Sequence, residues 1–161
     1  MKVLVFSDSH SSLRFMREMM SRIRPDAVIH LGDHFDDAGI LAEEAPGTTV
    51  LRVPGNCDMF RVYGEPETLC PQLFGVRLYM THGHRHGVKQ SLYKLLQEAR
   101  QAGAQAALYG HTHRADLHWE EDGLLVLNPG SSGSGGSAAL LELCDGKIKD
   151  CRLIDERDLT K

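Results

Sequence analysis

The amino-acid sequence predicts an α/β fold in which two mixed sheets lie face to face and helices cover their outer sides. Along the first third, short apolar runs alternate with amphipathic segments in the order strand–helix–strand–helix–strand, which implies parallel strands with helices packed on them. Beyond Gly110, short strands are separated by Asp-Gly pairs at 122–123 and 145–146, which favour tight hairpins. Because 161 residues fit one domain, we expect residues 1–161 to share a single core.

The first half of the chain contains three predicted strands joined by two helices. Apolar runs predict the strands, and an apolar stripe at helical spacing predicts the first helix. Ser11 or Ser12 is a suitable N-cap for this helix, and Pro25 ends it. Asp36 or Asp37 is expected to cap the second helix. The strands are residues 2–6, 27–31 and 48–53, and the helices cover about residues 12–23 and 36–47.

The middle of the chain is less regular, and the strands beyond Gly110 are expected to be mostly antiparallel. Residues 61–72, with prolines nearby, are expected to form a loop. The Gly/Ser-rich stretch 130–136 lies between strands and leaves too little chain for a further domain, so we expect a loop at the rim of a site rather than a linker. The remaining strands are residues 76–81, 106–109, 117–119, 124–127, 138–143 and 148–153, and the longest helix covers residues 88–103.

Composition narrows the class of protein. The chain is 42% hydrophobic and 25% charged, which excludes a disordered chain, and its net charge of −4 argues against an extended nucleic-acid-binding face. No apolar run approaches the roughly 18 residues of a membrane helix, and the N-terminus does not resemble a signal peptide. We therefore expect a cytoplasmic protein with no membrane partner. The four cysteines form no CxxC pair and are expected to be free thiols. The sequence is compatible with a monomer and with a homo-oligomer.

Five short polar patterns directly follow predicted strands. In an open α/β sheet, the loops after the carboxyl ends of the strands converge on one crevice. In Asp-x-His and His-x-His, both side chains point the same way if the backbone is extended. The patterns are Asp8-Ser-His10, Gly32-Asp33, Gly55-Asn-Cys-Asp58, His82-Gly-His84 and Gly110-His-Thr-His113. The seven potential metal ligands among them are Asp8, His10, Asp33, Asn56, His82, His111 and His113.

The chemistry of these ligands indicates a two-metal site. Imidazole, carboxylate and amide groups without thiolates suit Mn, Fe, Co, Ni or Zn, and differ from a structural zinc site. Seven ligands are too many for one ion with open positions, but they fit two ions if one carboxylate bridges. Such sites hold ions about 3.5–4 Å apart and clamp both oxygens of an in-line phosphoryl displacement. Divalent ions also offset the repulsion between a phosphate and the cluster of Asp8, Asp33 and Asp58.

Taken in this order, the five patterns resemble the calcineurin-like metallophosphoesterases. The chain length and Gly55-Asn-Cys-Asp58, with cysteine where most members carry histidine, are similar to the small single-domain prokaryotic phosphodiesterase branch. The resemblance implies the metallophosphoesterase fold, a four-layer αββα sandwich. It also implies that one ion is held by Asp8, His10, Asp33 and His113. A second ion would be held by Asp33, Asn56, His82 and His111, so that Asp33 bridges the two ions.

The activity implied by this resemblance is a metal-dependent phosphodiesterase, in which a hydroxide bridging two metal ions attacks a small phosphodiester in line. Manganese is the expected metal because imidazole prefers borderline ions, with Ni, Co, Fe, Zn and Mg as alternatives. The absence of an evident Arg/Lys clamp near the ligands also favours diesters, because a monoester dianion gains most from such a clamp.

We also predict catalytic and substrate-binding roles for residues beside the metal ligands. The predicted catalytic group is Asp33, Asn56, Cys57 and Asp58. Cys57 stands where the family's histidine is thought to protonate the leaving group, and it fits a packed small side chain equally well. His84 and His34 are the candidates for contact with the substrate phosphate.

For the remaining histidines and Arg114, ordinary positions in the core or at the surface explain the sequence as well as a role in the site does. His30 is expected in the core and His118 at the surface, while His86 is a weaker candidate for the site. Arg114 fits a phosphate contact and an ordinary surface position equally well.

Three alternatives remain open from the sequence. One is a phosphomonoesterase. Another is a non-catalytic protein-interaction scaffold of the same fold, as in a related eukaryotic retromer subunit, which degraded ligands would favour. A metal-buffering protein is less consistent, because buffers use flexible His/Cys-rich tracts, whereas these ligands are spread along much of the chain.

Overall fold

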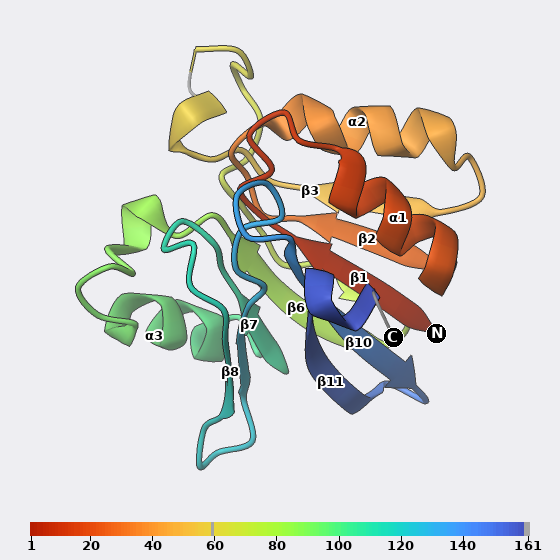
Figure 1. Cartoon of the computed structure of the whole chain (residues 1–161). Helices are drawn as coiled ribbons and strands as arrows, with labels where there is room; N and C mark the ends of the chain where they lie inside the picture. Colours follow the sequence, from red (N-terminus) through yellow and green to blue (C-terminus); the bar gives the residue numbers. More distant parts are fainter. Residues whose placement is uncertain (59, 160–161) are drawn as a thin grey trace.

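Two β-sheets pack face to face in the computed structural model, which describes residues 1–58 and 60–159 (Figure 1). One sheet contains, in spatial order, β11 (Lys147–Asp155), β10 (Ser137–Cys144), β1 (Lys2–Phe6), β2 (Ala27–His30) and β3 (Thr49–Arg52). The other contains β4 (Thr68–Leu69), β6 (Val76–Thr81), β7 (Ala106–Leu108), β9 (Leu125–Asn128) and β8 (Asp116–Trp119), and β5 (Gln72–Leu73) pairs with β6.

Helices cover the outer face of each sheet. Against the first sheet lie α1 (Arg14–Ile23) and α2 (Phe35–Glu44), and against the second lies α3 (Tyr93–Gln101) (Figure 1). The short 3₁₀ helices are η1 (Asn56–Asp58), η2 (His84–His86) and η3 (Glu156–Leu159). The fold is therefore the predicted α/β four-layer sandwich of two mixed sheets flanked by helices. Within the described residues, every helix is too short or too polar to cross a lipid bilayer.

Alternation along the strands divides the apolar side chains between an inner core and two outer cores. On β1, Val3 and Val5 face the second sheet, whereas Leu4 and Phe6 face the helices, and all four are fully buried. Each large apolar side chain buried in this way contributes roughly 1.5–3 kcal/mol. Both faces of the strand are thus held, which fixes the position of the loop that follows Phe6.

The loops that carry the polar patterns follow parallel strands. Strands β1, β2 and β3 are mutually parallel, and so are β6, β7 and β9. The prediction of mostly antiparallel strands beyond Gly110 is therefore wrong for the pairing of β9 with β7, which is parallel because the β8 hairpin returns the chain to the same end. It is confirmed for the predicted hairpins β8–β9 and β10–β11 and for the pair β1–β10.

Both predicted helix caps are wrong. Helix α1 begins after Leu13 without a capping side chain. Helix α2 is capped from a distance, because one oxygen of Asp58 accepts hydrogen bonds from the backbone N–H groups of His34 and Phe35 at 2.9 and 3.0 Å. A carboxylate at this position also complements the positive end of the helix dipole. Asp37, in contrast, faces the loop after β1.

Two further boundaries differ from the prediction. Helix α3 begins at Tyr93 rather than near residue 88, because residues 87–90 form a turn in which the backbone N–H groups of Gln90 and Ser91 donate to the carbonyl of Gly87 at 2.9 and 3.1 Å. The predicted loop at 61–72 contains the two-residue strand β4 and the first residue of β5. The Gly/Ser-rich stretch is an ordered loop, in which Ser131 and Ser132 are buried. All four cysteines are free, as expected.

Candidate metal centre

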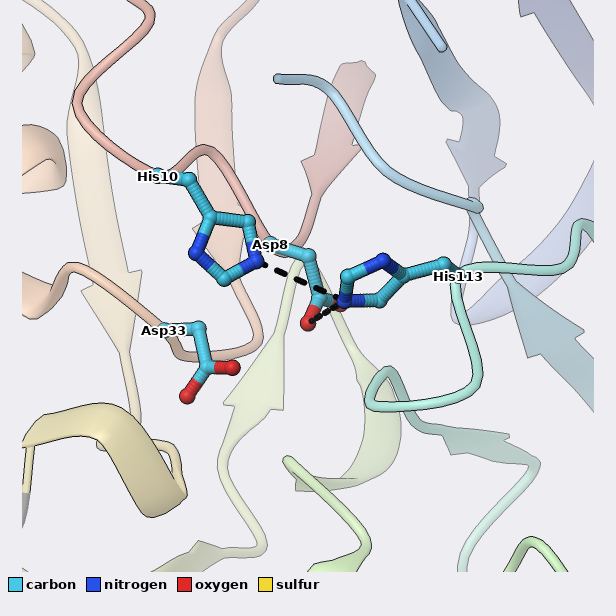
Figure 2. A group of neighbouring side chains, drawn as sticks. All are labelled: Asp8, His10, Asp33 and His113. Carbon is cyan, nitrogen blue, oxygen red and sulfur yellow. Dashed lines mark hydrogen bonds and ion pairs between the residues drawn. The ribbon is translucent and has the colours of Figure 1, made fainter. Parts of the chain in front are cut away.

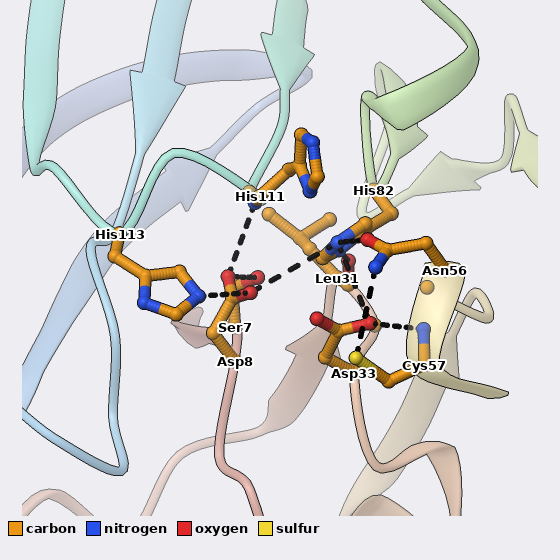
Figure 3. Close-up of polar contacts among 12 residues, drawn as sticks. Ser7, Asp8, Leu31, Asp33, Asn56, Cys57, His82, His111 and His113 are labelled. Carbon is orange, nitrogen blue, oxygen red and sulfur yellow. Dashed lines mark hydrogen bonds and ion pairs between the residues drawn. The ribbon is translucent and has the colours of Figure 1, made fainter. Parts of the chain in front are cut away.

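The five predicted loops meet at one edge of the sandwich, between the two sheets (Figures 2 and 3). The tightest group comprises four of the predicted ligands, whose ligand atoms all lie within 4.8 Å of one another. These four are Asp8, His10, Asp33 and His113. His113 Nε2 lies 3.0 Å from Asp8 Oδ1 and 3.4 Å from His10 Nε2. Residues separated by more than 100 positions in the sequence thus point at one spot.

The other three predicted ligands lie beside this group and are Asn56, His82 and His111, with His82 between the other two. The Nε2 atom of His82 lies 3.1 Å from Asn56 Oδ1, 3.5 Å from Asp33 Oδ1 and 3.9 Å from Asp8 Oδ1. The ring of His111 lies against the ring of His82, with 5.1 Å between their centres. The structure therefore brings all seven predicted ligands together, with Asp33 between the two subsets.

The donor set fits cations because several lone pairs face one another. His82 Nδ1 lies 2.7 Å from the carbonyl oxygen of Leu31, so it donates its proton there and leaves a lone pair on Nε2. That lone pair faces the oxygens of Asn56 and Asp33. Asp8 Oδ1 is buried without a hydrogen bond, while its Oδ2 accepts from Ser7 Oγ and from the backbone N–H of His111. Buried acceptors rarely lack a partner, and a divalent ion would satisfy them.

The backbone is strained at the predicted ligands. Asp8, His10, Asp33, His111 and His113 all have φ between 47° and 67°, the left-handed region that non-glycine residues seldom occupy. Such conformations cost on the order of 1–3 kcal/mol each and cluster at functional sites. Sequence reasoning assumed extended Asp-x-His and His-x-His segments. The ligand atoms of Asp8 and His10 converge, but the tight turn of their backbone brings this about.

Close packing of the loops also restricts two glycines. A side chain at Gly55 would overlap the carboxylate of Asp33, and one at Gly110 would overlap Ser7 and approach Asp8. Glycine at these positions lets the backbone lie against the ligand carboxylates, as the pattern Gly-Asn-Cys-Asp requires.

Charge and burial act in opposite directions on the site carboxylate Asp33. Burial raises its pKa. The charge of His82, the hydrogen bonds from the backbone and thiol of Cys57, and the charge of His10 together outweigh burial and leave the pKa below its ordinary value. Burial is the main cause that lowers the pKa of His111 to about 4, with further contributions from His82 and Lys89. An ionised carboxylate and neutral imidazoles are the forms that bind metal ions.

The two candidates for substrate contact lie at opposite sides of the cluster. The ring of His84 is 5.5 Å from that of His82, and both of its ring nitrogens are buried without a hydrogen-bond partner among the described residues. Burial, and then His82, lower the pKa of His84. His34 packs its ring against His10 at 5.4 Å, and its Nδ1 lies 2.8 Å from Ser11 Oγ. His84 therefore has free nitrogens facing the centre, whereas His34 is partly engaged.

Asp58 has a structural position that sequence reasoning missed. Its carboxylate is buried and accepts hydrogen bonds from three backbone N–H groups, those of His34, Phe35 and Gly55. It therefore ties the loop after β2 to the loop after β3, and its oxygens are not free to orient a side chain at position 57. We infer that Asp58 holds the loops that carry Asp33 and Asn56 in place and does not transfer a proton.

Cys57 lies at the open rim of the centre. Its backbone N–H donates to Asp33 Oδ1 at 2.9 Å, and its thiol is exposed and lies 3.6 Å from Asn56 Nδ2. Loss of hydration, followed by the hydrogen bond and charge of Asp33, raises the thiol pKa to about 11. A neutral thiol is a weak hydrogen-bond donor.

We expect Cys57→Ala to lower kcat/KM for an aryl phosphodiester by less than about threefold, because a weak donor contributes little when the leaving group needs no proton. Cys57→His should raise activity, most of all on diesters with poor leaving groups, and without assistance from Asp58. The measurement is kcat/KM against leaving-group pKa for all three proteins. A loss of roughly 10²-fold in Cys57→Ala with metal content unchanged would make the thiol catalytic.

His30 lies behind the ligands in a buried series of hydrogen bonds that runs from Gly32 to Asp37. The backbone N–H of Gly32 donates to its Nδ1 at 3.2 Å, so the ring proton is on Nε2 and faces Ser9 Oγ at 3.0 Å. Ser9 then donates to Asp37 at 2.7 Å. Burial is the main cause that lowers the pKa of His30 to about 4. His30 is in the core, as predicted, and it is buried as a neutral ring.

We expect the free energy of unfolding to fall by about 3 kcal/mol between pH 6.5 and pH 4 because of His30 alone. The unfolded chain takes up the proton below about pH 6.5, whereas the folded chain takes it up only below about pH 4, so stability is lost as the pH falls. Urea unfolding of metal-stripped protein at several pH values measures this loss. The variant His30→Gln should lose this part of the pH dependence, and the exposed-ring variant His118→Gln should keep it. Equal pH dependence in His30→Gln and the parent protein would contradict the assignment.

The two remaining histidines, His118 and His86, lie outside the proposed metal centre. His118 is half-exposed beside Asp116 and Glu120. His86 is buried, and its Nε2 lies 3.1 Å from the hydroxyl of Tyr79 and 3.0 Å from Glu98. These contacts attach η2 to α3, so His86 supports the loop that carries His84.

Sequence reasoning also missed the residues that support Asp8. The side-chain hydroxyls of Ser131 and Ser132 donate to the backbone carbonyls of Asp8 and Ser7 at 2.9 and 3.0 Å. Asn128 donates to the carbonyl of Gly110 at 3.0 Å. The polar residues at the end of the strand 125–128 and directly after it could have predicted that this loop also reaches the site.

The chain belongs to the calcineurin-like phosphoesterase superfamily, whose domain model matches residues 1–146. A probable metallophosphoesterase of Mycoplasma pneumoniae is 36% identical over 134 residues, which cover 81% of this chain and 78% of that protein. A crystal structure of a predicted phosphoesterase from Streptococcus pneumoniae aligns with a TM-score of 0.78 at 29% identity and covers 96% of this chain and 88% of that one.

More distant solved structures share the fold. An archaeal phosphodiesterase aligns with a TM-score of 0.71 at 23% identity, covering 96% of this chain and 99% of that one. The protein Vps29 of Entamoeba histolytica, crystallised with Zn²⁺, aligns with a TM-score of 0.74 at 22% identity and the same coverage. At these identities the likeness concerns the fold alone, and it includes both a named enzyme and a vacuolar sorting protein.

Proposed function

We propose that this protein is a metal-dependent phosphodiesterase with a dinuclear centre. The convergence of seven potential metal ligands on one edge of the sandwich, four of them with ligand atoms within 4.8 Å of one another, carries the proposal. One ion is assigned to Asp8, His10, Asp33 and His113, and the other to Asp33, Asn56, His82 and His111. When bound, two divalent ions would lower the pKa of water towards neutrality and neutralise charge on the phosphate.

The protein's own groups prepare the ligands. The hydrogen bond from His82 Nδ1 to Leu31 orients the ring with Nε2 towards the centre. Ser7 holds one oxygen of Asp8, which leaves the other free. The side chains of Ser7 and Ser9 are fully buried, and their hydroxyls donate to Asp8 and Asp37, so neither can reach a substrate as a nucleophile. His84 is the proposed donor to a non-bridging phosphate oxygen.

The choice of a diester rests on charge. No lysine or arginine side chain of the described residues is hydrogen-bonded or ion-paired to any of the seven ligands. The dianion of a monoester gains more from such cations than a diester monoanion does. The distant likeness to a phosphodiesterase is consistent with this choice.

The experiment is a matched pair of substrates on Mn²⁺-loaded protein, bis(4-nitrophenyl) phosphate and 4-nitrophenyl phosphate. We expect the larger kcat/KM for the diester. A larger kcat/KM for the monoester would change the assignment to a phosphomonoesterase. Hydrolysis of neither substrate with Mn²⁺, Ni²⁺, Co²⁺, Zn²⁺, Fe²⁺ or Mg²⁺ would favour the scaffold role, which the intact set of seven donors argues against.

A further inference from the structure

A hollow of about 580 Å³ lies on the flank of the metal centre, between the loop before α3 and the loop after β7. Its lining residues are Val88, Lys89, Tyr109, Thr112, Arg114 and Asp116. Thr112 stands between the proposed ligands His111 and His113 in the sequence, so the hollow shares a wall with the centre. The volume is within the range of pockets that hold small molecules.

Two cations line this hollow without a carboxylate partner among the described residues. Lys89 and Arg114 are both exposed, whereas other surface arginines such as Arg85 and Arg100 form ion pairs with Glu67 and Asp122. The charge of Lys89 is felt at His111, where it adds to burial and His82 in lowering the pKa of that ring. Sequence reasoning found no cationic clamp because residues 89 and 114 are brought together only by the fold.

The acidic residue on the wall forms an ion pair with neither cation. Asp116 Oδ2 accepts a hydrogen bond from the Tyr109 hydroxyl at 2.9 Å, and its Oδ1 lies 3.0 Å from His118 Nδ1. Both oxygens are therefore engaged by neighbours. Val88 and Tyr109 are almost fully buried and form an apolar floor. The hollow thus combines an apolar base with two cations that form no ion pair within the described residues and one carboxylate, so its lining is positive by one charge.

We propose that this hollow binds a second anionic group of the substrate, so that the enzyme prefers phosphodiesters carrying a further phosphate near the scissile one. The inference rests on the proposed phosphodiesterase function. Lysine supplies a point charge and arginine a planar fork, which together suit a phosphate group. Among the described residues, neither side chain is hydrogen-bonded or ion-paired to a proposed metal ligand, so both are available to a group other than the scissile phosphate.

The test compares thymidine 5′-(4-nitrophenyl phosphate) with the same diester carrying a 3′-phosphate, on Mn²⁺-loaded protein. We expect kcat/KM about tenfold higher for the 3′-phosphorylated substrate, the size expected of two partly exposed ion pairs. In the double variant Lys89→Gln, Arg114→Gln, the ratio should fall to near one. A parent ratio near one, or a ratio that survives the double substitution, would overturn the proposal and leave the diesterase activity standing.

The matched control is the double variant Lys147→Gln, Lys149→Gln. It removes the same charge from exposed residues of β11, near the hairpin at the end of the sheet away from the β1 loop. The substrate ratio should remain at the parent value. An equal fall in this variant would assign the preference to net charge and overturn the role of the hollow.

A binding measurement separates failure of this inference from failure of the proposed function. If the parent hydrolyses neither diester, calorimetry compares thymidine 3′,5′-bisphosphate with thymidine 5′-monophosphate on the same Mn²⁺-loaded protein. About tenfold tighter binding of the bisphosphate, lost in Lys89→Gln, Arg114→Gln, would support the hollow although the enzyme assignment had failed. Equal binding of the two nucleotides would overturn the hollow as well.

Discussion

Asp33→Asn is expected to lower kcat/KM for bis(4-nitrophenyl) phosphate by roughly 10³-fold or more, equivalent to about 4 kcal/mol of transition-state stabilisation. Asp33 lies between the two ligand subsets, close to His82 on one side and within the group of Asp8, His10 and His113 on the other. Loss of its negative charge weakens both proposed metal positions at once. Steady-state kinetics at saturating Mn²⁺ measure the effect.

Asp36→Asn is the matched control for this substitution. It makes the same chemical change three residues away, on the exposed side of α2, and should leave kcat/KM near the parent value. Circular dichroism and urea unfolding would establish that Asp33→Asn is folded. A folded Asp33→Asn protein with parental kcat/KM would require the bridging assignment to be abandoned.

Removal of divalent ions is expected to abolish hydrolysis altogether. The site contains buried carboxylates and neutral imidazoles, and within the described residues no lysine or arginine is hydrogen-bonded or ion-paired to a proposed ligand. Without metal ions, an anionic phosphate would meet the charges of Asp8 and Asp33. Treatment with excess chelator should reduce the rate to background.

Restoration of activity should depend on the metal. Mn²⁺ should restore at least as much activity as Mg²⁺, because Mg²⁺ prefers oxygen ligands and retains water, whereas four of the seven proposed ligands are imidazoles. Rates are measured as each ion is titrated into chelator-stripped protein, with Ca²⁺ as a hard-cation control. Full activity in protein shown by elemental analysis to be metal-free would contradict the mechanism.

The convergence of the seven ligands was predictable because each follows a strand. The strands before Asp8, Asp33 and His82 are apolar runs, and burial of both faces of such strands fixes where their loops lie. Five loops at one end of two packed sheets then meet without any further information. The same reasoning predicted the class of fold, since the outer helices are amphipathic.

Contacts between distant loops were not predictable in this way. The sequence suggests Asp36 or Asp37 as a cap because both are adjacent to α2, yet Asp58 caps it from the loop after β3. Lys89 and Arg114 likewise share a hollow only because the loops before α3 and after β7 are packed together. Propensities describe neighbours in the chain, and these roles depend on neighbours in space.

The number of metal ions bound per chain tests the dinuclear centre most directly. Chelator-stripped protein is dialysed to equilibrium against Mn²⁺ and its metal content is measured by mass spectrometry for the parent, His113→Ala and Asp33→Asn. We expect two ions in the parent, one in His113→Ala, which removes a ligand from one ion only, and fewer than two in Asp33→Asn. A parent protein that hydrolyses phosphodiesters while binding one ion or none, or variants that retain both ions, would contradict the account.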